Sequence, residues 1–141
     1  MSAVDHSQVL EFKLGEERYC VDIEHVAEIV DVGSLTAVPN APPYVEGVMD
    51  LRGRTTSIID PTVLFDIRTE SKPKRIVVFD PDSVGNGGAV GWLVDEVDQV
   101  IQAPEEDLDD APVEEDTGIK GVLKRDEDFA VWVEPTVMQD N

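Results

Sequence analysis

The sequence predicts a mostly β protein, folded as a small barrel or a pair of barrels with a few short helices. Two features of the 141-residue chain lead to this fold class. Apolar and polar residues mostly alternate in short runs, which is the pattern of strands with one buried face. Turn-forming residues separate these runs at short intervals, as in small barrels. Apolar residues make up 41% of the chain, which is enough to build a core.

The first two predicted strands form a hairpin. Residues 10–14 alternate between apolar and polar side chains, and residues 19–23 do so again after a turn at 15–18. A short helix is expected next, with Asp22 as its cap. Its apolar stripe would consist of four residues at helical spacing: Ile23, Val26, Ala27 and Val30.

The middle of the chain combines a proline-rich loop with two strands and a helix start. The segment 39–43 contains three prolines, which break regular structure. Residues 45–52 and 54–59 are predicted strands that join at Gly53. Asp60-Pro61 then predicts a helix start, because aspartate caps a helix and proline suits the first helical position.

The second half of the chain is again predicted to be β. Residues 75–79 contain an unbroken apolar run and are expected to form a central strand. Strands are also expected at 89–94 and 97–101. A final hairpin would pair 118–123 with 129–133, and the acidic stretch 105–116 is expected to be a solvated loop.

Charge is the strongest compositional signal. The chain has 31 acidic and 11 basic residues, for a net charge of −20. Such a surface repels nucleic-acid phosphate and anionic lipid, so neither is an expected partner. The surplus is spread along the chain, which favours adaptation to a high-salt cytoplasm, where charge repulsion is screened. The alternative is an ordinary acidic protein with a cationic partner.

The expected location is the cytoplasm. No apolar run is long enough to span a bilayer. The first six residues carry no positive charge, and no apolar stretch follows them, so they do not resemble a secretory signal. The single cysteine, Cys20, excludes an internal disulfide and a cysteine metal cluster.

The sequence predicts neither an enzyme nor a metal site. His6 and His25 are 19 residues apart, with no Cys or His pair at ligand spacing. His25 is expected on the exposed side of the short helix. Cys20 has no histidine at a recognisable offset and is expected to be a half-buried core residue. Trp92 and Trp132 lie in strand patterns and are expected in the core.

One segment reverses the charge of the chain. Residues 52–75 contain six basic residues against three acidic ones. This island could simply balance the surrounding acidic surface. Alternatively, Arg52 is fixed at a tight turn beside Gly53. Its guanidinium could there pair with an internal carboxylate such as Glu28, or reach a partner protein.

At these residues the sequence resembles the CheW family, the adaptors of bacterial and archaeal chemotaxis arrays. The resemblance covers roughly residues 8–138. The Leu-Arg-Gly and Leu-Val-Asp signatures are specific in this order, although each alone would be weak. The motifs that carry the resemblance include Tyr19-Cys20-Val21-Asp22-Ile23, Val26-Ala27-Glu28-Ile29, Asp50-Leu51-Arg52-Gly53 and Gly91-Trp92-Leu93-Val94-Asp95-Glu96-Val97.

The resemblance implies one CheW-like domain over 8–138, made of two intertwined SH3-like five-stranded β-barrel lobes, with flexible termini at 1–7 and 139–141. It implies a non-enzymatic adaptor without a cofactor. Such an adaptor couples the regulatory domain of the histidine kinase CheA to the cytoplasmic tips of methyl-accepting chemotaxis receptors. It would join membrane receptor arrays through protein contacts, without inserting into the membrane. An acidic decoy that mimics nucleic acid and binds a basic partner is the alternative function.

The resemblance also carries site residues over by position. The receptor-binding candidates are Val26, Glu28, Gly47, Arg52 and Val100. The kinase-binding candidates are Leu10 and Ile23. The two predictions for Val26 conflict, because the predicted helix stripe buries its side chain whereas docking needs it partly exposed. We give docking more weight, since a helix this short can lie at the edge of a lobe.

Overall fold

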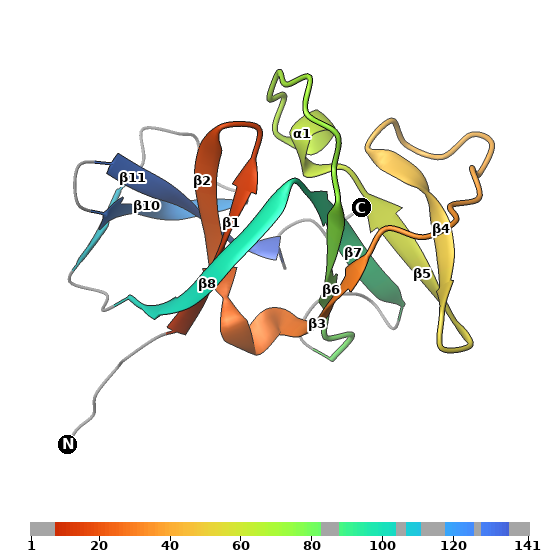
Figure 1. Ribbon diagram of the computed structural model, residues 1–141, viewed down its shortest axis with the longest axis horizontal. Coiled ribbons are helices and arrows are strands. Elements are labelled where there is room, and N and C mark those ends of the chain that lie inside the picture. The colour runs from red at the N-terminus through yellow and green to blue at the C-terminus, as the bar shows by residue number, and fades with distance from the viewer. Residues whose placement is uncertain (1–7, 83–87, 104–106, 111–117, 126–127, 136–141) are drawn as a thin grey trace.

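The computed structural model describes residues 8–82, 88–103, 107–110, 118–125 and 128–135. The described chain is mostly strand, with one 3₁₀ turn and one short helix, as predicted (Figure 1). The elements are β1 (Gln8–Leu14), β2 (Glu17–Asp22), η1 (Ile23–His25), β3 (Val26–Asp31), β4 (Val45–Leu51), β5 (Arg54–Ile59), α1 (Pro61–Leu64), β6 (Arg75–Phe79), β7 (Ala89–Val94), β8 (Glu96–Gln102), β9 (Leu108–Asp109), β10 (Ile119–Arg125) and β11 (Asp128–Val133). The predicted flexible termini, 1–7 and 139–141, lie outside the described residues.

The strands form two sheets, which we call lobe A and lobe B. Lobe A has the strand order β8-β1-β2-β11-β10-β9, and lobe B has the order β3-β6-β7-β5-β4. Figure 1 shows them side by side, with lobe A on the left. Lobe B is a continuous stretch of chain inserted between β2 and β8, so the chain leaves lobe A at η1 and returns after β7. This arrangement confirms the mostly β fold class with two lobes.

Lobe A has one strand more than the five expected. The extra strand is β9, which pairs with β10 through Leu108 and Asp109. It lies within the acidic stretch 105–116, which was expected to be a loop throughout. Leu108 explains the difference, because it packs against the apolar interior of lobe A and so fixes this short segment.

A second correction concerns the helix expected from Ile23. Only Ile23–His25 form a 3₁₀ turn, and Val26–Asp31 form strand β3, which pairs with β6. Two of the four apolar residues, Val26 and Val30, also fit strand spacing, because they are four positions apart and so lie on one face of β3. β-Branched residues favour strands, and the free edge of β6 supplies hydrogen-bonding partners that an isolated helical turn lacks.

Three apolar clusters form the core. The largest lies between the lobes and includes Leu10, Phe12, Leu14, Tyr19, Val21, Ile59, Val77, Phe79, Trp92, Val94 and Val133. Trp92 is at its centre, with the rings of Phe12, Phe65 and Phe79 edge-on at 5.1–6.5 Å between centroids. Two smaller clusters fill the lobe interiors, one around Trp132 in lobe A and one around Ile58 in lobe B.

The strands next to the lobe boundary are therefore buried on both faces. In β1, Leu10 faces the shared cluster while Val9 faces the interior of lobe A. Glu11, the polar residue between Leu10 and Phe12 in the alternating run, is only 2% exposed. Cys20 is also fully buried rather than half-buried, and both tryptophans lie in the core as expected.

The helix start, the central strand and the two hairpins predicted from the sequence are confirmed. Asp60 caps α1, where its Oδ1 accepts a hydrogen bond from the Thr62 backbone N–H at 2.9 Å, and Pro61 is the first helical residue. β6 lies inside its sheet, as expected of a central strand. The first and last hairpins form with the expected antiparallel pairing. Among the described residues, no helix is long and apolar enough to cross a membrane.

Candidate functional site

The turn between β4 and β5 fixes the position of Arg52. Leu51 pairs with Arg54, so only Arg52 and Gly53 form the loop. Both have positive φ, 53° and 82°, as a two-residue hairpin turn that follows the strand twist requires. Glycine adopts this conformation freely, whereas for arginine it costs about 1–2 kcal/mol. The turn therefore holds Arg52 in a backbone conformation that the residue does not prefer.

Arg52 forms a two-pronged ion pair with Glu28 on β3. Arg52 Nη2 lies 2.9 Å from Glu28 Oε1, and Nη1 donates to Oε2 at 3.0 Å. The Glu28 side chain is 26% exposed, and that of Arg52 is 76% exposed. The structure thus brings together two of the predicted receptor-binding residues, 24 positions apart, in the pairing that the sequence left open.

The pair closes lobe B. β3 and β4 are the two outer strands of this sheet. Beyond β3, Thr36 forms a β-bridge with Val48 of β4, with two backbone hydrogen bonds of 2.9 Å. Together with the Arg52–Glu28 pair, this bridge joins the opposite edges of the sheet, so that the sheet curves into a barrel.

Gly47 lies beside this bridge and is buried. A Cβ atom at Gly47 would lie 2.5 Å from the backbone oxygen of Thr36, far inside contact distance. Close backbone packing therefore requires a glycine here, and Gly47 has no side chain to offer to a partner.

A groove follows the boundary between the lobes. It has a volume of about 520 Å³ and is lined by Ile29, Lys74, Arg75, Asp95, Glu96 and Val97. Its residues come from β3, from the start of β6 and the residue before it, and from the junction of β7 and β8, so both lobes contribute to it. Arg75 pairs with Asp31 at 3.2 Å. The groove thus has apolar patches between charged residues of both signs.

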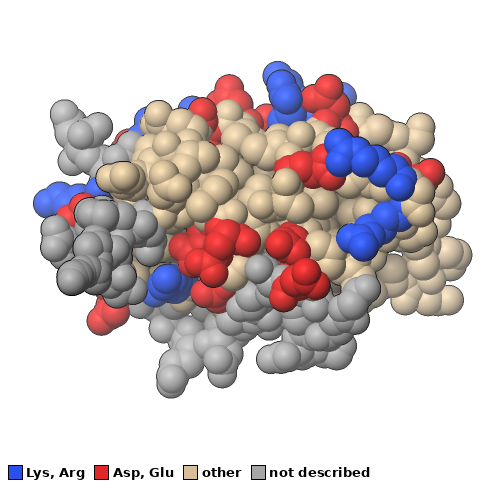
Figure 2. Space-filling view, turned by 90° about the horizontal axis from the view of Figure 1, so that it is seen from below, with Lys and Arg blue, Asp and Glu red and all other residues tan. Residues whose placement is uncertain are grey.

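Charge is unevenly spread over the surface. On the face shown in Figure 2, basic side chains lie towards both ends of the molecule and at its upper rim, while carboxylates gather near the middle. The basic residues of 52–75 accordingly include ones that pair with carboxylates, as Arg52 does with Glu28 and Arg75 with Asp31. Local charge balance therefore accounts for part of this segment, while Arg52 stays largely exposed within its ion pair.

The apolar candidates divide by exposure. Val100 is 47% exposed on the outer strand β8. Ile23 and Val26 are half-buried and pack against the shared cluster between the lobes. Val26 is thus partly exposed, although it lies on a strand and not on the expected helix. Leu10 pairs with Val100 in the β1–β8 ladder, but it is only 2% exposed and belongs to the shared cluster.

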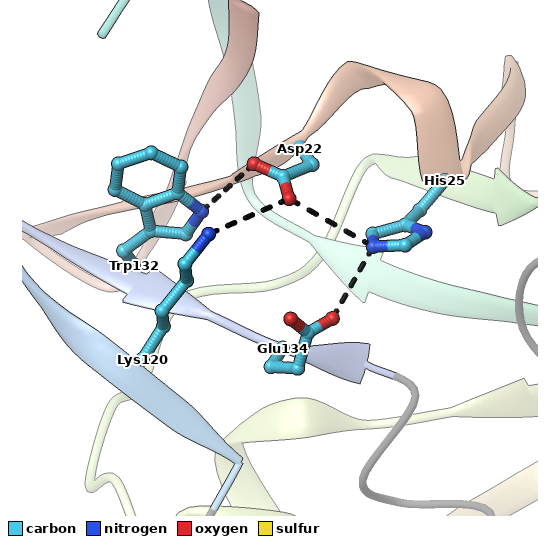
Figure 3. A network of polar contacts seen from close by, with 5 residues as sticks. All are labelled: Asp22, His25, Lys120, Trp132 and Glu134. Carbon is cyan, nitrogen blue, oxygen red and sulfur yellow. Dashed lines mark hydrogen bonds and ion pairs between the residues drawn. The ribbon is translucent and has the colours of Figure 1, made fainter. Parts of the chain in front are cut away.

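Sequence reasoning missed a polar network at the crossing between the lobes. His25 was expected on the surface, but its side chain is only 12% exposed. Its Nε2 lies 3.2 Å from Glu134 Oε1 and 3.9 Å from Asp22 Oδ2. Asp22 also pairs with Lys120 and accepts a hydrogen bond from Trp132 (Figure 3). Because Glu134 is so distant in sequence, no local pattern could have indicated this network.

Comparison with known proteins agrees with this architecture. The model of the CheW-like domain matches residues 8–140. The chain is 30% identical over 135 residues to the chemotaxis protein CheW of Thermotoga maritima, covering 94% of this chain and 87% of that protein. It is 35% identical over 108 residues to the chemotaxis protein CheW of Treponema pallidum, covering 74% of this chain and 63% of that protein.

Among solved structures, the scaffolding protein TtCheW from Thermoanaerobacter tengcongensis superposes with a TM-score of 0.81 at 29% sequence identity. The match covers 94% of this chain and 86% of that chain. The family model, the Thermotoga maritima relative and the solved structure therefore agree over nearly the whole length. The chain belongs to the CheW-like domain family.

Proposed function

We propose that this chain is a non-enzymatic chemotaxis adaptor that couples the histidine kinase CheA to methyl-accepting receptors. Its family and its likeness to a scaffolding protein support the class of function. The observation that carries the proposal is the Arg52–Glu28 pair. It holds an exposed guanidinium on the two-residue turn between β4 and β5, and the resemblance leads us to expect receptor binding at Arg52.

The receptor side would combine this arginine with apolar surface. Arginine is among the residues that most often dominate an interface, and the centre of an interface is usually apolar. Val100 and the exposed side of Val26 supply apolar surface on β8 and β3. Glu28 would orient the guanidinium, and Gly47 would let the backbone of lobe B close behind it. The fit to a receptor tip would then depend on shape more than on net charge.

The kinase side would involve the crossing segment and β1. Ile23 is half-buried where the chain leaves lobe A, so part of its side chain is open to a partner. Leu10 is buried, so its part would be to support this surface from below by packing in the shared cluster. A contact by Leu10 itself would require the lobes to move.

Simultaneous binding of both partners would produce the coupling. An adaptor that holds kinase and receptor together raises the effective concentration of one at the other. It passes on a conformational bias only if it binds the receptor's states with different affinity. A shared core between the lobes suits this task, because the two docking surfaces then keep a fixed geometry.

Co-sedimentation tests the proposal. A receptor-tip fragment and the regulatory domain of CheA are each mixed with the chain in multi-molar KCl, and binding is quantified. We expect the wild type to bind both, and Arg52→Ala to lose most receptor binding while keeping kinase binding and the fold. Arg54→Ala is the matched control, because Arg54 is an exposed arginine two residues away on the same hairpin.

Two outcomes would overturn the proposal. One is a folded wild type that binds neither partner. The other is binding to a cationic protein that disappears on adding salt, without affinity for receptor tips, which is the behaviour of an acidic decoy. Unfolding of Arg52→Ala would instead assign Arg52 a structural role through Glu28.

A further inference from the structure

Five side chains converge where the chain crosses from lobe A to lobe B (Figure 3). They are Asp22 at the end of β2, His25 in η1, Lys120 in β10, Trp132 in β11, and Glu134 just beyond β11. Figure 3 shows the Asp22 and Glu134 carboxylates on either side of the His25 ring edge that carries Nε2. The side chains of Asp22, His25 and Glu134 are 16%, 12% and 28% exposed, so the group is largely shielded from water.

The geometry points to a binding site for a divalent transition-metal ion formed by Asp22, His25 and Glu134. Each residue offers one donor atom, and the three atoms lie within 4.8 Å of one another. Two carboxylates facing one imidazole nitrogen repel each other, and Lys120 offsets the charge of Asp22 only in part. Nε2 is 3.2 Å from Glu134 Oε1 but 3.9 Å from Asp22 Oδ2, so a single hydrogen bond from Nε2 reaches Glu134 and not Asp22. A metal ion would satisfy all three donor atoms together.

The spacing suits a small ion. Zinc binds histidine nitrogen and carboxylate oxygen at about 2.0–2.2 Å, so neighbouring ligands of a tetrahedral site are about 3.3–3.6 Å apart. The distances of 3.2 Å and 3.9 Å from Nε2 bracket this value. An imidazole with two carboxylates favours zinc, nickel or cobalt over calcium, which takes oxygen ligands only. Three protein ligands would leave one position for water.

Surrounding contacts hold the donors in place. Trp132 Nε1 donates to Asp22 Oδ1 at 3.1 Å, which leaves Oδ2 directed towards His25. The backbone N–H of Glu134 donates to Gly118 at 2.7 Å. The carbonyl of His25 accepts from Asp80 N–H at 2.8 Å. Such outer contacts orient metal ligands and affect affinity strongly.

The tautomer of His25 depends on what binds Nε2. The other ring nitrogen, Nδ1, is buried and has no hydrogen-bond partner among the described residues. Nothing at Nδ1 therefore selects a tautomer. A metal ion at Nε2 would leave the proton on Nδ1.

Lys120 is a built-in competitor for the ion. Its Nζ lies 3.8 Å from Asp22 Oδ2, so its positive charge partly neutralises the carboxylate that the ion would bind. The same Nζ lies 4.4 Å from the centre of the Trp132 ring. The Lys120 side chain is 31% exposed, so it can turn towards solvent when an ion enters. Removing its charge should therefore strengthen metal binding.

Zinc titration by calorimetry tests the site, with the wild-type chain in high KCl and excess Mg²⁺ to saturate weak carboxylate sites. We expect one zinc ion per chain. His25→Ala should weaken binding at least tenfold, and Glu134→Gln should weaken it to a similar extent. His6→Ala is the control for the other histidine of the chain and should leave binding unchanged. Circular dichroism establishes that each variant is folded.

Lys120→Gln separates a metal site from a purely structural network. We expect zinc affinity to rise by a factor of about three or more, because a competing positive charge is lost. In a structural network the same variant would only lower stability. Zinc binding that is absent in the wild type, or equal in wild type and folded His25→Ala, would overturn the proposal. Loss of binding in His6→Ala would also overturn it.

Discussion

The Arg52 guanidinium, in the turn between β4 and β5, contacts both carboxylate oxygens of Glu28 on β3. These residues belong to opposite edges of the lobe B sheet, so the contact closes the barrel as well as orienting the arginine. Ion pairs at the surface contribute only about 0.2–1 kcal/mol. We therefore expect the pair to fix the orientation of the Arg52 side chain more than to stabilise the fold.

Arg52→Gly separates these two roles. Glycine removes the ion pair but also relieves the left-handed backbone conformation that costs arginine about 1–2 kcal/mol. We expect the free energy of unfolding to change by less than about 1 kcal/mol, while receptor binding is lost. Urea unfolding and co-sedimentation measure the two effects. A large loss of stability in this variant would contradict the assignment of Arg52 to the interface.

Gly47→Ala should damage the fold itself. Its Cβ would lie 2.5 Å from the Thr36 carbonyl oxygen, and the φ of 155° is unfavourable for alanine. Overpacking and backbone strain together should cost about 3 kcal/mol or more. Gly53→Ala is the control, because a Cβ there would meet nothing within 4 Å beyond its chain neighbours, and only the φ of 82° opposes it. Urea midpoints for the two variants should differ clearly, and equal midpoints would show that Thr36 moves aside.

Local patterns predicted much of this fold. Alternation located the strands and the Asp60-Pro61 pair located α1, because these features depend on neighbouring residues. The helix expected at Ile23 was wrong, since Val26 and Val30 satisfy strand and helix spacing equally and only β6 decides between them. The likeness to a family supplied the remaining step, from separate strands to two lobes.

Of the two polar sites, the sequence indicated the Arg52–Glu28 pair but not the contact of His25 with Glu134. The pairing of Arg52 with Glu28 was one of two options for the arginine, because a fixed turn residue needs a nearby carboxylate or a partner. The contact of His25 with Glu134 could not be anticipated, since it depends on β11 lying beside β2. Long-range strand order is what the sequence left undetermined.

Tyr19 should make the protein sensitive to alkali. Burial raises the pKa of Tyr19 above its ordinary value, and the nearby Glu17 carboxylate raises it further. The folded state therefore keeps the phenolic proton at a pH where the unfolded state releases it. Its contribution to stability is complete below the unfolded pKa of about 10, and it is lost as pH rises towards the folded value. Unfolding free energies above that pH should fall less steeply in Tyr19→Phe. Equal slopes would contradict the prediction.

Trp92 should couple the unfolding of the two lobes. It packs against Phe12 of lobe A and Phe79 of lobe B within the shared cluster. Trp92→Ala should cost about 3–5 kcal/mol, as for other large aromatic side chains removed from a core. Trp132 then remains as the fluorescent probe of the lobe A interior. In the wild type, the unfolding transitions seen by tryptophan fluorescence and by circular dichroism should coincide, and two separate transitions there would disprove the coupling.

Stability should rise with salt. The net charge of −20 makes the compact state repel itself, and the described residues include closely spaced carboxylates such as Asp107, Asp109 and Asp110. The screening length falls from about 10 Å at 0.1 M salt to about 3 Å at 1 M, so this repulsion should largely disappear. Urea unfolding in increasing KCl measures the effect, because urea adds no ions.

Replacing the three aspartates by asparagine should raise stability in dilute salt and reduce the dependence on KCl. An unfolding free energy that is the same in dilute and multi-molar KCl would rule out adaptation to high salt, and the acidic surface would then need another explanation, such as a cationic partner.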